Sequence, residues 1–197
     1  GGIRDLYKIA VPTPLGNPQA AAQVQEIQAQ DFKLSSLFEV LDPKSYLADL
    51  PAEGMSIDKD PWVQVGAQGV TKCKVTKASG QIELECKLFE VARGGKSVLS
   101  LSFRGKEDEL RGLVHQWVNK VIGYFTGEDG VFGTRLAFSR RIGPGSKHVY
   151  TADWSGGGVA ICTATGDQEA VVMIPDGAGG VFLAWEDRRD DDWDIYA

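Results

Sequence analysis

Apolar residues recur at helical spacing between residues 110 and 125, and the pattern predicts a long helix with one buried face. The stripe consists of Leu110, Leu113, Val114, Trp117, Val118, Val121, Ile122 and Phe125. Gly127 and Gly130 follow it and are typical of a helix end. After Gly133 the pattern changes to short alternating runs, which indicate strands. The chain therefore changes near residue 131 from one kind of structure to another.

The pattern before residue 131 alternates between strands and helices. Strands are expected at residues 6–11, 37–41, 70–76, 81–91 and 96–104. Asn17 is a candidate N-cap with Pro18 at the first helical position of a helix ending near Leu34. One or two helical turns are expected within residues 45–50, and a short helix from about residue 60. Residues 1–131 are thus predicted to form an α/β domain, a mixed sheet covered by two main helices.

Residues 132–197 contain an internal repeat. Leu136-Ala137-Phe138 returns as Leu183-Ala184-Trp185, and Val149-Tyr150 returns as Ile195-Tyr196. A period in the mid-forties with short strands is typical of β-propeller blades. Residues 159–197 alone show four strand-like runs, one blade's worth of sheet. We expect an all-β partial propeller of one to two blades; chance similarity between two hairpins is the alternative.

Composition narrows the possible partners. The 197 residues carry a net charge of −6, whereas nucleic-acid binding needs clustered Lys and Arg. The sequence shows no apolar run of the roughly 18 residues that a membrane span requires. Neither nucleic acid nor a membrane span is therefore expected.

The spacing of two cysteines predicts a disulfide. Cys73 and Cys86 lie in alternating runs joined by Ser79-Gly80. If Ser79-Gly80 is a two-residue hairpin loop, Cys73 faces Cys86 in a non-hydrogen-bonded pair with Cα atoms about 4.5 Å apart. A disulfide tolerates that distance, and it would indicate an oxidising compartment. The alternative is two buried thiols that meet in a reduced protein, and Cys162 is left unpaired.

Six segments follow one another in a recognisable order: KIAVP, LSSLFEVLDP, GAQGVTKCKVT, IELECKLFEV, TGEDGVFGTRLAFSRR and VYTADWSGGG. In this order they resemble the TolB family of the Tol-Pal envelope system. The resemblance covers about residues 3–158 and is most specific at the helix-to-strand junction. It implies an α/β domain followed by a propeller, a periplasmic location, no enzymatic activity, and the partners Pal and TolA.

The resemblance also implies a binding segment. In the family the tail before the first strand responds to TolA, and here the residues able to fill that role are Ile3, Arg4, Asp5 and Leu6. The family's Pal-binding surface lies on the propeller, of which this chain holds about one and a half blades. After Gly158 the sequence resembles a different bacterial blade-type repeat, and we expect a join near residues 156–159.

No residue pattern indicates catalysis, a cofactor or a metal. His115 and His148 have no sequence neighbour to act with and are interpreted as surface or satisfied histidines. Asp190, Asp192 and Asp194 alternate, but they lack the Gly and distal Glu of an EF-hand and are expected in a solvated turn. Trp185, Trp193 and Tyr196 fit inter-blade packing better than a sugar-stacking shelf.

Three functions remain after these exclusions. The first is a non-enzymatic TolB-like interaction module. The second is a self-assembling scaffold, of chimeric, engineered or natural origin, whose blade segment oligomerises to complete a propeller, since a lone blade exposes its faces and edges. The third, weaker alternative is a carbohydrate-binding module.

Overall fold

The computed structural model describes residues 5–153, 158–175, 181–189 and 193–196. The chain forms two units, Gly1–Phe132 and Gly133–Ala197. The boundary lies one residue later than the predicted 131/132, because Phe132 belongs to the first core and is 6% exposed. Asn119 holds it there: Asn119 Oδ1 accepts from the Phe132 N–H at 2.9 Å, and Asn119 Nδ2 donates to the Phe132 carbonyl at 2.7 Å.

The first unit is a mixed sheet with helices on both faces. Its elements are β1 (Tyr7–Ala10), β2 (Leu15–Gly16), α1 (Pro18–Leu34), β3 (Phe38–Val40), η1 (Pro43–Ser45), α2 (Leu50–Glu53), α3 (Lys59–Gln64), β4 (Gly69–Ala78), β5 (Gln81–Glu90), η2 (Val91–Arg93), β6 (Leu99–Lys106), η3 (Glu107–Glu109) and α4 (Leu110–Thr126). The strand order is β3-β1-β4-β5-β6, with β2 beside β4. β1 runs parallel to β3 and β4, whereas β4, β5 and β6 are antiparallel.

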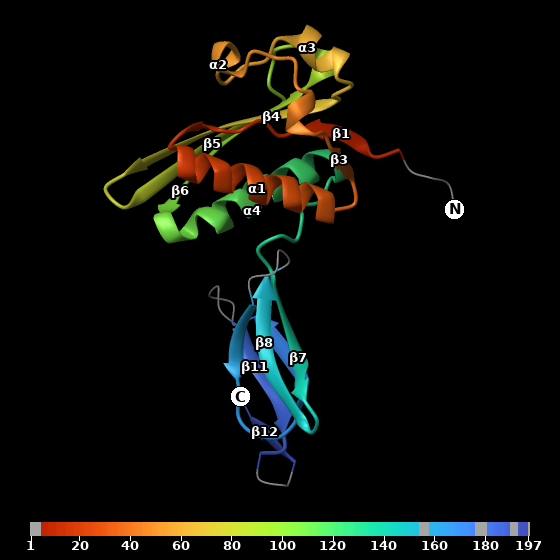
Figure 1. The fold of residues 1–197 in the computed structure, drawn as a ribbon, viewed down its shortest axis with the longest axis vertical. Helices are drawn as coiled ribbons and strands as arrows, with labels where there is room; N and C mark the ends of the chain where they lie inside the picture. Colours follow the sequence, from red (N-terminus) through yellow and green to blue (C-terminus); the bar gives the residue numbers. More distant parts are fainter. Residues whose placement is uncertain (1–4, 154–157, 176–180, 190–192, 197) are drawn as a thin grey trace. The chain divides into compact units, whose positions relative to one another are not determined.

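Helices α1 and α4 lie side by side over one face of this sheet, and α2 and α3 lie over one end of the other face (Figure 1). The larger core fills the space between the sheet and the helices α1 and α4; it includes the apolar stripe predicted for α4, with Phe125 packed against its border. A smaller core surrounds the fully buried Trp62 of α3. The predicted mixed sheet with two main helices is confirmed.

Local chemistry sets the ends of the two main helices. The Asn17 side chain accepts a hydrogen bond from the Ala20 N–H at 3.0 Å, and Pro18 begins α1 as predicted. Gly127 ends α4 in the left-handed conformation (φ 88°), and its N–H donates to the Gly123 carbonyl at 2.9 Å. Residues marked in the sequence therefore set the beginning of α1 and the end of α4.

The β4–β5 hairpin has the register expected from its sequence. Ser79 and Gly80 both have positive φ (51° and 75°), as a two-residue hairpin turn requires. Ala78 then faces Gln81, and Cys73 faces Cys86. These cysteines form a disulfide with Cα atoms 4.2 Å apart, and both are buried in the larger core.

The helical turns expected within residues 45–50 do not form; short helices flank this segment instead. η1 ends at Ser45, and α2 begins only at Leu50. Between them Tyr46 is extended (ψ 129°), which places its ring 5.0 Å from the Trp62 ring. The Tyr46 hydroxyl also accepts from the Val11 N–H at 3.0 Å. Packing of this one tyrosine into the smaller core outweighs the helical tendency.

The second unit contains two three-stranded antiparallel sheets. Its elements are β7 (Arg135–Gly143), β8 (Ser146–Asp153), β9 (Gly158–Cys162), β10 (Gln168–Pro175), β11 (Val181–Asp187) and β12 (Asp194–Tyr196). The orders are β7-β8-β9 and β10-β11-β12. The expectation of a four-stranded blade from residues 159–197 is wrong, because β9 pairs with β8 rather than with the later strands.

Each of the two sheets contains a stacked pair of aromatic rings at corresponding positions of the sequence repeat. Phe138 faces Tyr150 across β7 and β8, and their rings stack at 5.8 Å and 18°. Trp185 faces Tyr196 across β11 and β12, and their rings stack at 6.3 Å and 20°. Corresponding residues of the repeat thus occupy corresponding cross-strand positions.

Candidate partner-binding surface

The residues predicted to bind a partner lie directly before β1. Ile3 and Arg4 lie outside the described residues. Asp5 and Leu6 are exposed, and 40% of Leu6 is accessible to solvent. The Leu6 side chain, directly before β1, is therefore available for contact with another chain.

Tyr7 fixes the point at which this segment leaves the sheet. Its hydroxyl donates to the Gln68 carbonyl at 2.8 Å, and its ring lies 4.6 Å from that of Phe125. Gly69 makes room for the ring, since a Cβ there would lie 2.7 Å from Tyr7 Cε1. Burial, with a smaller contribution from the Glu90 carboxylate, raises the pKa of Tyr7 to about 12, so it stays a hydrogen-bond donor.

Gln68 holds the next residue from both sides. The Lys8 N–H donates to Gln68 Oε1 at 2.8 Å, and the Gln68 N–H donates to the Lys8 carbonyl at 2.8 Å. These bonds join positions 60 residues apart in the sequence. Residues 5 and 6 therefore extend from a rigid base, which reduces the conformational entropy lost on binding.

A pocket opens beside this base. It is lined by Asp5, Leu6, Tyr7, Lys8, Glu39, Gly66 and Gln68. Lys8 of β1 lies opposite Glu39 of β3 and both are exposed, so charges of both signs flank the apolar Leu6. The arrangement suits an extended peptide with an apolar side chain between polar ones. The sequence predicted Asp5 and Leu6 as contact residues, and this role stays a prediction; nothing in the sequence near Glu39, Gly66 or Gln68 marks these three as neighbours of that segment.

The sheet face covered by α2 and α3 holds a closed ionic cluster. Glu53 of α2 pairs with Lys72 of β4 at 2.6 Å, and their side chains are 6% and 5% exposed. The Trp62 indole N–H donates to the other Glu53 oxygen at 2.9 Å. All three charged or polar groups are satisfied within the protein, so the cluster attaches α2 and α3 to the sheet and is closed to a ligand.

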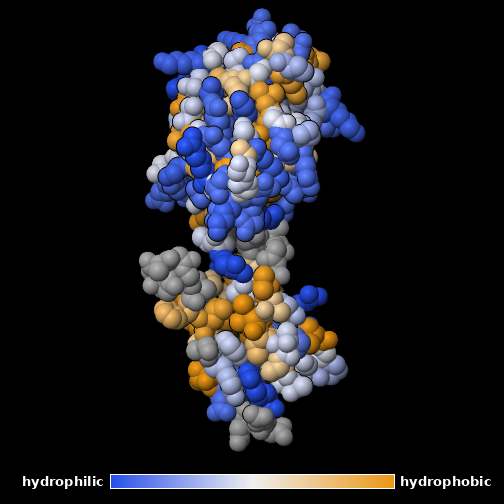
Figure 2. Space-filling view, turned by 90° about the vertical axis from the view of Figure 1, so that its left-hand side faces the viewer, coloured by the Kyte–Doolittle hydropathy of each residue, from blue (hydrophilic) through white to orange (hydrophobic). Residues whose placement is uncertain are grey.

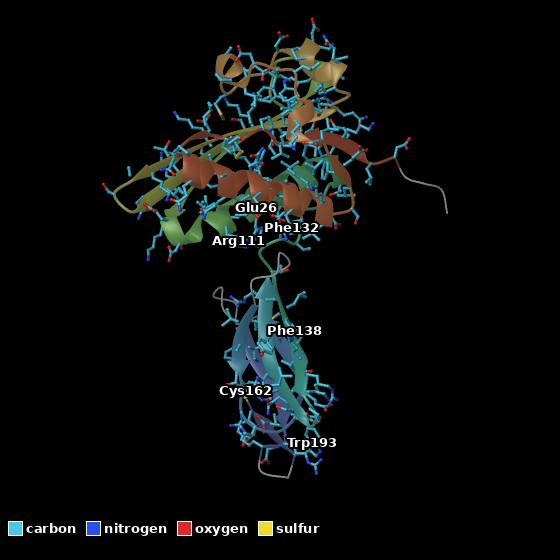
Figure 3. All side chains as sticks on the ribbon, viewed as in Figure 1. Glu26, Arg111, Phe132, Phe138, Cys162 and Trp193 are labelled. Carbon is cyan, nitrogen blue, oxygen red and sulfur yellow. A yellow bond between two sulfur atoms is a disulfide. The ribbon has the colours of Figure 1, made fainter. Side chains whose placement is uncertain are left out.

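A second buried polar contact joins α1 to α4. His115 Nδ1 lies 2.6 Å from Asp31 Oδ2, with both side chains buried. Beside them the Trp117 indole N–H donates to Gln28 Oε1 at 3.0 Å. His115 is thus a core histidine. Nearer the surface, Glu26 of α1, labelled in Figure 3, lines another pocket between these helices.

The polar centre of the second unit is Asp187, at the end of β11. It accepts from the Trp185 indole at 3.1 Å and from the Arg189 backbone N–H at 3.0 Å, and it pairs with the Arg189 guanidinium. The Arg189 hydrogen bond is the main cause that lowers the pKa of Asp187. Cys162, a free thiol, lies 3.6 Å from Arg189 Nη2. The cluster fixes the chain after β11.

The aromatic residues considered for sugar stacking do not form a shelf. Trp185 is 9% exposed and stacks on Tyr196, whereas Trp193 is 50% exposed. Among the described residues no group of three or more His, Cys, Asp or Glu side chains could hold a metal ion. Asp190 and Asp192 lie outside the described residues, and Asp194 begins β12. No helix of the described residues is long and apolar enough to cross a membrane.

Comparison with known proteins gives one consistent family. Residues 1–97 match the model of the TolB amino-terminal domain. The chain is 36% identical over 181 residues to the Tol-Pal system protein TolB of Anaeromyxobacter dehalogenans strain 2CP-C, covering 88% of this chain and 40% of the relative. It is 31% identical over 188 residues to that of Myxococcus xanthus strain DK1622, covering 92% and 43%.

A solved structure shows the same fold. TolB from Acinetobacter baumannii superposes with a TM-score of 0.81 at 16% identity, covering 97% of this chain and 46% of that one. The chain thus spans about 40% of the length of the curated relatives that it matches. The similarity continues past Gly158, since residues 1–158 are about 80% of the chain and the matches cover more. The join near residues 156–159 stays a prediction, and residues 156 and 157 lie outside the described ones.

Proposed function

Since this chain belongs to the TolB family, with residues 1–97 matching its amino-terminal domain, we propose that it is a non-enzymatic protein–protein interaction module of the Tol-Pal envelope system. It acts in the periplasm, where the Cys73–Cys86 disulfide would persist. Its partners are TolA, bound through the first unit, and Pal.

The observation that carries this proposal is the exposed Asp5-Leu6 segment on its rigid base. Tyr7 and Lys8 are each held by Gln68, so the segment presents Leu6 in a defined direction beside the pocket. Family resemblance assigns residues 3–6 to contact with TolA. The polar rim of Lys8 and Glu39 around one apolar side chain has the composition of a small, transient interface.

Affinity for TolA tests this assignment. Leu6→Asp replaces an apolar contact by a charge, and we expect it to weaken TolA binding by at least about tenfold in isothermal titration calorimetry. The matched control is Leu47→Asp, since Leu47 is another exposed leucine of the first unit at 63%. Equal TolA affinity for the two variants would refute the role of the segment.

Binding of Pal is proposed for the second unit. Its two three-stranded sheets are interpreted as incomplete propeller blades, consistent with a chain that spans about 40% of its relatives. Titration of the whole chain with Pal tests this part separately. Absence of binding at high Pal concentration would remove Pal from the partners and leave the TolA assignment intact.

A second candidate function is self-assembly through the second unit, and an exposed apolar sheet face favours it. Figure 2 shows apolar surface gathered in the second unit. On the β10-β11-β12 sheet Ile174 faces Phe182, and the alternation of the strands puts Val172 and Ile195 on the same side. These four residues are 56%, 65%, 60% and 72% exposed, respectively. Such a face is completed in a propeller by the next blade, here from another copy.

Solution mass by light scattering tests self-assembly. A discrete multiple of 21.3 kDa that is lost on Phe182→Lys would support a ring of copies. A wild-type chain that stays monomeric at micromolar concentration would exclude this function.

A further inference from the structure

The outer edge of β6 is an unpaired strand edge. β6 is the last strand in the order of the first sheet, and none of the described residues of this unit pairs with its other side. It is eight residues long, and its burial alternates strictly. A strand edge of this kind presents a row of backbone N–H and C=O groups with which another extended chain can pair.

The hairpin register identifies the free groups. Ala78 and Gln81 flank the two-residue turn and form a hydrogen-bonded pair, so odd-numbered residues of β5 bond to β4 and even-numbered ones to β6. The Glu107 N–H, which donates to the Gly80 carbonyl at 3.3 Å, continues the same alternation. On β6 the outward-pointing backbone groups are therefore those of Ser100, Ser102 and Arg104.

This edge is complementary to itself. In an antiparallel pair centred on Ser102, Ser102 faces its own copy, Ser100 faces Arg104, and Leu101 faces Phe103. Each of the three outward pairs can exchange two hydrogen bonds, and no like charges face each other.

Helix α4 leaves room for a copy on the same face. It packs over both β5 and β6, and a groove beside it is lined by Arg104, Glu109, Gly112, Leu113 and Gln116. A Cβ on Gly112 would meet nothing within 4 Å, so the helix surface is open there. With strands spaced about 4.8 Å apart, α4 and its twofold copy would lie about 10 Å apart, a normal helix-packing distance.

We propose that two copies of this chain associate through β6, antiparallel and centred on Ser102, so that the two sheets become continuous and the α4 helices pack side by side. The contact is isologous, which gives a closed dimer rather than a filament. It differs from self-assembly through the second unit and from TolA binding at the start of β1. Either of those can fail without affecting it.

Introducing a charge at Ser102 tests the twofold contact. The Ser102 side chain is exposed, so Ser102→Lys and Ser102→Glu leave the monomer fold intact. Each variant sets two like charges at the centre of the pair, and we expect the dimer dissociation constant to rise by about tenfold. An equimolar mixture of the two variants should restore dimers, because the central charges are then opposite. Sedimentation velocity at high micromolar concentration, in the Phe182→Lys background, measures the β6 contact alone.

Thr76→Lys is the matched control, since Thr76 is an exposed residue of the same sheet that lies away from the edge. It should leave the dimer unchanged. A monomeric parent protein would overturn the proposal. A dimer that tolerates Ser102→Lys, or single variants whose mixture does not dimerise, would also overturn it.

Discussion

At the scale of single residues, the first unit depends on a charged pair placed where water does not reach. Glu53 accepts from both Lys72 and the Trp62 indole, and through them α2 and α3 are attached to the sheet. An unpartnered charge left at such a site is costly to bury.

Glu53→Ala should therefore lower the free energy of unfolding of the first unit by about 3 kcal/mol, because Lys72 stays buried without its partner. Urea denaturation measures the loss. Glu85→Ala is the control, since Glu85 lies 3.7 Å from Lys87 with 40% of its side chain exposed, and its effect should stay within about 0.5 kcal/mol. Equal losses in the two variants would contradict the role of burial.

Asp187 should make the second unit sensitive to acid. Its folded-state pKa is lowered, mainly by the Arg189 hydrogen bond. The stabilisation is therefore complete above the unfolded-state value of about 3.9 and is lost as the pH falls through the folded-state pKa.

Asp187→Asn should lower the thermal midpoint of the second unit at neutral pH and reduce its dependence on pH below about 4. Circular dichroism melts across pH 2–7 measure both. Glu186→Gln, which changes an exposed carboxylate on the other face of β11, is the control and should keep the wild-type profile. If the acid transition persists in Asp187→Asn, another titratable group causes it.

At the scale of elements, the sequence predicted best where one short signal determines the geometry. The Ser79-Gly80 loop sets the register of β4 and β5, and with it the contact of Cys73 with Cys86. Asn17 and Gly127 likewise mark helix ends through their own backbone preferences. In each case the decisive residues lie within a few positions of the element they control.

The disulfide across this hairpin gives a prediction for the element itself. Cys73→Ala with Cys86→Ala should cost about 3 kcal/mol, the chain-entropy value for a loop of this length. Hydrogen exchange of the slowest amides of β4 and β5 measures the loss. Reductant should produce the same loss in the wild-type chain and none in the variant. If neither the double variant nor the reduced wild-type chain loses protection, the disulfide contributes little to stability.

The elements that the sequence misplaced depend on distant partners. Tyr46 becomes extended because Trp62 receives its ring, which no local signal indicates. β9 pairs with β8 rather than with the later strands. The sequence could not predict this pairing, because the spacing of short strands does not specify which strand lies beside which. The base of the candidate binding segment is of the same kind, because Gln68 meets Lys8 across 60 positions.

At the scale of the whole molecule, the two units differ in how completely they bury their apolar residues. The first has a continuous core between sheet and helices, whereas the second leaves Phe182 and Ile195 largely exposed. The first unit therefore has the features of a complete domain. The second has the features of a part that another blade or copy completes.

Chemical-shift mapping of the isotope-labelled chain titrated with TolA tests whether the segment before β1 binds TolA. We expect the largest shifts on Leu6, Tyr7 and Lys8, extending to Glu39, Gly66 and Gln68, which line the same pocket. The amides of β4 and β5 near the Cys73–Cys86 bridge should stay unchanged. Shifts confined to other surfaces, or none at saturating TolA, would contradict the assignment of this segment as the TolA-binding element.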